Sequence, residues 1–271
     1  MIENKSSKKS ILIILAMIFT AHSAWSQIPI DSSKIIKVLS FNILHGATMK
    51  GDFDLDVIAK VITDTDPDFV ALQEVDYKTN RAKQYDLVTE LGWRTKMTPL
   101  FARAMYFDGG EYGEGILSKY TFVKTRNIAL PYTPGNEPRA AIEITTVLPS
   151  GDTIVFVGTH LDHLEDEKDR LAQAEKINKV FSVNKYPTIL SGDLNAFPGS
   201  TTINILEQMW TPSYNKEKPL FTFPSDNPQV KIDYVMYYPE NRWRVLKTEV
   251  IQDTVASDHC AYLVTIELLD N

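Results

Sequence analysis

The chain has 271 residues and a formal net charge of −7 at pH 7. A chain of this length can bury one large core, and its acidic balance excludes a general attraction to nucleic acids and other polyanions. Cys260 is the only cysteine, so an intramolecular disulfide is excluded and the fold must rely on its core. Cys260 stands in a strand-like run and is interpreted as a buried apolar residue.

The amino terminus has the order of a secretory signal peptide. Lys5, Lys8 and Lys9 precede an uncharged apolar stretch over residues 11–21, and small residues follow at Ala24 and Ser26. We therefore predict a signal peptide over residues 1–26 and one domain over residues 27–271, with a formal charge of −9 after cleavage. About eleven apolar residues are too few for a hydrocarbon core that needs roughly 20, so no stable membrane anchor is expected. An uncleaved anchor is the alternative to export into a periplasmic, cell-surface or secreted location.

The remaining chain alternates short apolar strands with a few amphipathic helices. Strands are predicted over residues 35–41, 69–75, 116–117, 140–147, 153–159, 188–190, 232–238 and 261–266. Helices are predicted over residues 55–64 with Asp54 as cap, over residues 83–91 ahead of Gly92, and over residues 165–181. Several strands are apolar on both faces, which predicts sheets covered on each side by helices or by a second sheet.

Polar residues stand where these apolar runs end, and we expect them to converge along one rim of the sheet core. They are Asn42, Glu74, His160, Asp193 with Asn195, Asp233, and Asp258 with His259. Carboxylates, amides and imidazoles, with no candidate Cys nucleophile and no Gly-rich phosphate loop, favour hydrolysis of a phosphoester assisted by a hard cation over acyl transfer or redox chemistry. Mg²⁺ is the expected cation and Mn²⁺ a possible substitute.

Asp193, Asn195 and Glu74 are the clearest candidates for catalysis and metal binding among these residues. Asp193 and Asn195 lie on one side after a buried strand, where the carboxylate would orient or deprotonate water and the amide would donate to the phosphoryl group. An Asx turn is the alternative. Glu74 lies in an apolar strand, where an unpaired charge is costly, and a bound cation or a salt bridge would account for it.

The other positions are less specific when taken singly. His160 ends a strand and has a second interpretation as a hydrogen-bonded core histidine, and Asn42 has one as a turn residue. Asp233 is an acid within an apolar run, and Asp258 with His259 precedes the last strand.

Together these segments resemble the endonuclease/exonuclease/phosphatase superfamily, also called the deoxyribonuclease I-like fold. The resemblance covers residues 41–262 and rests on Gln73-Glu74, Gly192-Asp193-Leu194-Asn195 and Ser257-Asp258-His259 in this order. It implies an α/β catalytic domain built as a four-layer α/β/β/α sandwich, in which two mixed β-sheets are flanked by helices and the active site lies at one edge.

The resemblance also implies roles. Glu74 is the expected main Mg²⁺ ligand, assisted by Asn42 and Asp258. Asp193 would orient or activate water, Asn195 would donate to the transition state, and His160 and His259 would contact phosphate. Asp233 would hold His160, and Arg139 takes the place of a phosphate-binding arginine, with a surface ion pair as its alternative.

The substrate is not determined by the fold. Leu44 takes a position where the abasic-site repair branch has a second metal carboxylate, which argues against DNA repair, and residues 108–118 look like those of the exported bacterial hydrolases of this superfamily. The leading hypothesis is a phosphodiesterase or phosphatase for a small molecule or lipid head group, without an obligate protein partner. The alternatives are a secreted nuclease acting on nucleic acid and a non-catalytic binding protein on this scaffold.

Overall fold

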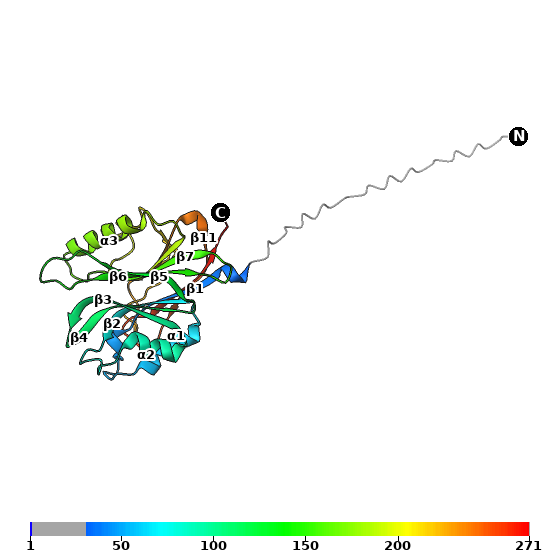
Figure 1. Cartoon of the computed structure of the whole chain (residues 1–271). Helices are drawn as coiled ribbons and strands as arrows, with labels where there is room; N and C mark the ends of the chain where they lie inside the picture. Colours follow the sequence, from blue (N-terminus) through cyan, green and yellow to red (C-terminus); the bar gives the residue numbers. More distant parts are fainter. Residues whose placement is uncertain (2–30, 271) are drawn as a thin grey trace. The chain divides into compact units, whose positions relative to one another are not determined.

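The computed structural model describes Met1 and residues 31–270. Apart from Met1, the predicted signal peptide lies outside the described residues. Among the residues that are described, no helix combines the length and apolar character needed to span a bilayer. Two six-stranded sheets pack face to face, with helices on their outer sides (Figure 1).

The first sheet is mixed. Its strand order is β11 (Trp243–Ile251), β12 (Ala261–Leu268), β1 (Ile35–Asn42), β2 (Phe69–Tyr77), β4 (Gly110–Ser118) and β3 (Thr98–Phe107). The central pair β1 and β2 is parallel, and all other neighbours are antiparallel. Parallel β1 and β2 end at the same edge, which places Asn42 beside Gln73.

The second sheet is also mixed. Its order is β5 (Phe122–Ala129), β6 (Ala140–Val147), β7 (Thr153–His160), β8 (Thr188–Asp193), β10 (Asp233–Tyr238) and β9 (Thr211–Pro212). Here β7 and β8 are parallel and the other pairs are antiparallel. The predicted α/β sandwich of two mixed sheets is therefore confirmed.

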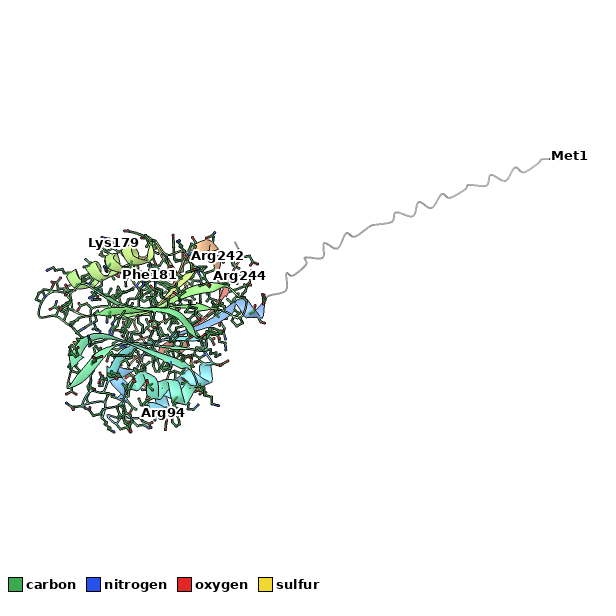
Figure 2. The ribbon with its side chains drawn as sticks, viewed as in Figure 1. Met1, Arg94, Lys179, Phe181, Arg242 and Arg244 are labelled. Atoms are coloured by element: carbon green, nitrogen blue, oxygen red, sulfur yellow. The ribbon has the colours of Figure 1, made fainter. Side chains whose placement is uncertain are left out.

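Three apolar layers hold the sandwich together. Side chains such as Val38, Phe69 and Phe156 fill the space between the sheets. Helices α1 (Leu55–Thr65) and α2 (Leu87–Thr95) cover the outer face of the first sheet, whereas α3 (Lys168–Phe181) and α4 (Thr201–Leu206) cover that of the second. In Figure 2, Lys179 and Phe181 mark α3 on one side of the sandwich and Arg94 marks α2 on the other.

The helix over residues 55–64 is confirmed as α1, and the Asp54 side chain accepts a hydrogen bond from Asp56 N. The helix expected over residues 83–91 is wrong in both limits. Lys83 and Gln84 have left-handed backbone angles, and Asp86 caps a helix that starts at Leu87. Gly92 lies inside α2. A Cβ at this position would meet Pro99 Cβ at 3.0 Å. The glycine therefore permits close packing rather than ending the helix.

Helix α3 begins at Lys168, three residues after the predicted start. Helix α4, the two-residue strand β9 and the longer strands β3, β5 and β11 were not predicted. These three strands lie at sheet edges and their residues are mostly half-buried or exposed, so they lack the apolar run that marks a buried strand. Three short 3-10 turns complete the described chain, at Ser32–Lys34, Leu44–Gly46 and Glu240–Arg242.

Candidate active site

The polar strand ends meet at one edge of the sandwich. On the second sheet, Asp193 of β8 lies between His160 of β7 and Asp233 of β10. Asn42 of β1 joins the first sheet to this row, since its Nδ2 donates to Asp193 Oδ2 at 3.3 Å. A cavity of about 380 Å³ opens above them, and seven of the nine predicted site residues line it: Glu74, Arg139, His160, Asp193, Asn195, Asp258 and His259. Asn42 and Asp233 are buried beside it.

Glu74 reaches the cavity through an irregularity in β2. The pairing of β2 with β4 shifts between Leu72 and Val75, and Glu74 adopts a left-handed φ of 57°. Such a conformation costs about 1 kcal/mol or more for a residue other than glycine, and bulges of this kind re-aim side chains near active sites. Burial raises the pKa of Glu74, but contacts with His45, His160 and Asn42 outweigh it and lower the pKa to about 2. Glu74 is therefore ionised at neutral pH.

Asn42 orients two carboxylates. Its Nδ2 donates to Glu74 Oε1 at 3.1 Å and to Asp193, while its Oδ1 accepts from Leu44 N at 3.1 Å. Because the backbone N–H of Leu44 fixes which amide atom is the oxygen, the nitrogen is the atom that faces Glu74. This geometry gives Asn42 an orienting role and does not present its oxygen to a cation beside Glu74.

Asp258 lines the same cavity as Glu74. Burial raises the pKa of Asp258, and the negative charge of Glu74 adds to the rise. Two carboxylates that line one cavity and repel each other are the donor set that a hard divalent cation stabilises. The residues present therefore fit the divalent cation that the resemblance implies, with Glu74 and Asp258 as its carboxylate ligands.

His259 lies between two buried aspartates. Its Nδ1 is 3.1 Å from Asp233 Oδ2, and its Nε2 is 3.6 Å from Asp193 Oδ2. Burial opposes protonation, but the charges of Asp233 and Asp193 raise the pKa of His259 to about 10. Burial also raises the pKa of Asp193 to about 7, against the opposing effect of His259. The site thus holds an imidazolium beside a carboxylate that can take up a proton near neutral pH.

The role expected for Asp233 is wrong in its partner, because Asp233 holds His259 and not His160. The sheet order explains this result. β8 separates β7 from β10, so His160 and Asp233 lie on opposite sides of Asp193.

Asp193, Asp233 and His259 are also close enough to hold a metal ion, with one ligand atom from each lying within 4.8 Å of the others. Two ion pairs to one imidazolium account for the same closeness, and a protonated imidazole offers no lone pair to a cation. The described residues offer two candidate positions for a cation, this group and the carboxylates of Glu74 and Asp258.

Arg139 and Asn195 surround His160. Arg139 is almost fully buried and its Nη1 lies 2.8 Å from His160 Nδ1, while its Nη2 lies 3.2 Å from His163 Nδ1. A guanidinium can only donate, so Nδ1 of His160 accepts and its proton lies on Nε2. That nitrogen lies 3.4 Å from an acceptor, Asp193 Oδ2. It also lies 3.0 Å from Asn195 Nδ2, which is a donor and hydrogen-bonds to Leu161 O. Burial and the charge of Arg139 hold the pKa of His160 well below its usual range, so it is a neutral donor.

The structure adds cavity residues that the sequence analysis did not single out. His45 follows β1 and lines the cavity. Arg81 also lines it and forms a two-point ion pair with buried Asp76. The Arg81 guanidinium lies 4.6 Å from the centroid of the Phe107 ring. Phe107 and Tyr112 come from the hairpin of β3 and β4. These residues do not end apolar runs, and no pattern in the sequence connects them with the strand ends.

A larger hollow of about 1020 Å³ lies between α1 and α2. Its charged residues, among them Asp56, Lys60 and Arg94, form exposed helix-surface ion pairs. No imidazole lies among its lining residues. We therefore place the chemistry in the smaller cavity at the strand ends.

Glu114 of β4 yields a test of the electrostatics in this region. It is fully buried, and neither carboxyl oxygen has a hydrogen-bond partner among the described residues. Burial raises the pKa of Glu114 well above 4.5, and Arg139 opposes this only in part. The folded protein retains this proton where the unfolded chain loses it, so the stability contributed by Glu114 is full below about pH 4.5 and falls as pH rises.

Glu114→Gln should therefore become more stable than the wild type as pH rises. The amide resembles the protonated acid and cannot ionise. We expect the melting temperature of the variant to exceed that of the wild type by about 2 °C or more at pH 8, which corresponds to roughly 1 kcal/mol in a protein of this size. Calorimetry from pH 5 to pH 9 measures the difference, and a difference that does not grow with pH would contradict an un-ionised Glu114.

The model of the endonuclease/exonuclease/phosphatase family matches residues 39–259, which include all nine predicted site residues and end at His259. This chain belongs to that family. Its members are generally hydrolases that act on phosphoester bonds and typically use a divalent metal.

Solved structures share the endonuclease/exonuclease/phosphatase fold with this chain. A family member from Beutenbergia cavernae has a TM-score of 0.70 at 21% identity, over 87% of this chain and 72% of its own. A mannosyl-6-phosphatase from Bacteroides thetaiotaomicron has a TM-score of 0.69 at 19% identity, over 85% and 99%. The human Nocturnin catalytic domain with bound sulfate has a TM-score of 0.68 at 20% identity, over 87% and 94%. At these identities the likeness establishes the fold only.

Proposed function

We propose that this chain is an exported phosphoesterase that depends on a divalent cation and hydrolyses a phosphodiester or phosphomonoester by attack of water. The observation that carries the proposal is one cavity that brings carboxylates and imidazoles together. Glu74 and Asp258 offer carboxylates suited to Mg²⁺ or Mn²⁺, and His160, Asp193 and His259 line the same cavity. A bound cation would supply charge stabilisation for the phosphoryl oxygens.

The chain's own groups supply the remaining chemistry. Asp193 would orient the attacking water and accept its proton, because its carboxylate lies at the centre of the row and its pKa is raised toward neutrality. The His259 imidazolium, held by Asp233, and the Nε2–H of His160 would donate to the phosphoryl oxygens. Asn195 donates its backbone N–H to Asp193 Oδ1, and it would add a further donor through the second N–H of Nδ2, since the other N–H is bonded to Leu161 O.

Arg139 would act mainly through the imidazoles. Its two terminal nitrogens contact His160 and His163, and Nη1 also pairs with Glu137 at 3.1 Å. A guanidinium in this position fixes the proton of His160 on the cavity side and keeps a positive charge beneath the phosphoryl group. Arg139 would also contact the phosphate directly, because it lines the cavity.

The substrate is proposed to be a small or lipid-derived phosphoester rather than duplex DNA. The chain is acidic, and the cavity of about 380 Å³ is lined by Glu74, Glu137 and Asp258 as well as by two arginines. A nuclease that neutralises several phosphates loses affinity steeply with salt, with a slope of about −0.9 per contact on B-DNA. A site that holds a single phosphate does not lose affinity steeply with salt.

We expect hydrolysis of bis-p-nitrophenyl phosphate to exceed cleavage of plasmid DNA and to respond weakly to salt. Both substrates are assayed from low to moderate salt at fixed Mg²⁺, and chelator provides the metal-free control. Efficient plasmid cleavage with a steep salt slope, together with negligible turnover of the diester, would favour the nuclease alternative. Absence of turnover on either substrate and on p-nitrophenyl phosphate would favour a binding protein.

Export is proposed on the sequence of residues 1–26. The mature protein is expected to begin near Gln27, where small residues precede the cleavage point. Mass spectrometry of protein recovered from cells tests this, and retention of residues 1–26 on membrane-bound protein would indicate an uncleaved anchor.

A further inference from the structure

His45 is directed at the principal carboxylate of the cavity by a constrained turn. It lies in the 3-10 turn Leu44–Gly46 directly after β1, and Leu44 and His45 both have a left-handed φ of 46°. The turn is held at both ends. Asn42 Oδ1 accepts from Leu44 N, and a Cβ on Gly46 would meet the Phe53 ring at 2.7 Å. Strained backbone at two consecutive residues is typical of a functional site, where the surrounding structure over-determines the conformation.

The turn places the His45 ring beside Glu74. His45 Nδ1 lies 3.4 Å from Glu74 Oε2, and each side chain is about a quarter exposed, at 26% and 25%. Both residues line the cavity that Asp258 also lines. At 3.4 Å the contact lies at the long limit of a hydrogen bond between nitrogen and oxygen, so hydrogen bonding does not by itself account for the position of the His45 ring.

The spacing suits two atoms that share one cation. Ligand atoms about 2.1 Å from a divalent ion, at angles between a right angle and the tetrahedral angle, lie about 3.0 to 3.4 Å from each other. Glu74 Oε1 accepts from Asn42, which leaves Oε2, the oxygen nearest His45, available to the cavity. His45 Nδ1 and Glu74 Oε2 are thus placed as neighbouring ligands.

We propose that His45 Nδ1 is a ligand of the divalent cation held by Glu74 and Asp258, and that it makes the site prefer ions that accept nitrogen, such as Mn²⁺, Co²⁺ and Zn²⁺, over Mg²⁺. This inference rests on the proposed function, because it takes the cation to lie beside Glu74. Mg²⁺ strongly prefers oxygen ligands and retains its waters, whereas later divalent metals bind imidazole more tightly. The proposal therefore deepens the metal assignment by naming a residue that sets its selectivity.

The test compares Mn²⁺ and Mg²⁺ binding by calorimetry in the wild type, His45→Ala, His45→Asn and the control His163→Asn. Pulsed electron paramagnetic resonance on the Mn²⁺-loaded proteins detects nitrogen bound to the ion. We expect Mn²⁺ affinity to fall at least about 10-fold in both His45 variants, which is the size of loss seen when residues around a bound metal are changed. Mg²⁺ affinity should change less than about 3-fold. Nitrogen coupling should be present in the wild type and in His163→Asn, and lost in both His45 variants.

Two results would overturn the proposal while leaving the proposed function intact. One is nitrogen coupling that persists in His45→Ala. The other is Mn²⁺ binding in His45→Asn that equals the wild type, because an asparagine side chain can still donate to Glu74 and would replace an imidazole that only orients it. Binding of neither metal to the folded wild type would overturn both the proposed function and this inference. Thermal melts of each variant establish that it is folded.

Discussion

Glu74→Gln is expected to abolish turnover that depends on the divalent cation while leaving the fold intact. The amide keeps the shape of the side chain but removes the negative charge, and Glu74 is the carboxylate whose pKa is lowered to about 2 in this cavity. We expect turnover to fall at least about 100-fold, because loss of a charged ligand removes charge stabilisation that acts in the transition state. Mg²⁺ affinity should fall with it.

The matched control is Glu111→Gln. It removes a carboxylate on β4 that pairs with Arg103 and does not line the cavity. Calorimetry measures Mg²⁺ affinity in both variants, and circular dichroism compares their folds. If Glu74→Gln bound Mg²⁺ normally and Asp233→Asn did not, the cation would belong to the group of Asp193, Asp233 and His259.

Asp193→Asn is expected to reduce turnover by at least about 100-fold, the scale of a lost general base. The change keeps the hydrogen bond from Asn195 N within reach but removes the proton acceptor. In the wild type, the rate should rise with pH through about pH 7, because burial raises the pKa of Asp193 to that value and the carboxylate must be ionised to accept a proton. The variant should lose this dependence.

Asp226→Asn serves as the control for this substitution, since Asp226 is exposed and lies outside the residues that line the cavity. Steady-state kinetics on bis-p-nitrophenyl phosphate across pH, with folded fractions measured alongside, separates a catalytic loss from an unfolded variant. A near-normal rate in Asp193→Asn would assign the base to another residue.

Several features could be predicted from the chain alone, because they are local. An apolar run that is hydrophobic on both faces indicates a strand such as β7, which is covered by a sheet and a helix. Asp54 before an apolar periodic segment predicts the start of α1. The edge strands β3 and β5 could not be predicted in this way, because their half-exposed residues carry no apolar run.

The polar residues at the strand limits were likewise available from the sequence. The ends of parallel neighbours lie at one edge of a sheet, and so do the end of a strand and the start of its antiparallel neighbour. The pairing among these residues was not available from the sequence. Asp233 contacts His259 instead of His160 only because β8 lies between β7 and β10, and strand order is a long-range property. The approach of His45 to Glu74 likewise depends on a left-handed turn after β1 and a bulge in β2 that face each other in the folded protein. Local residue chemistry therefore determined which groups this protein can use, and the tertiary arrangement decided which of them act on one another.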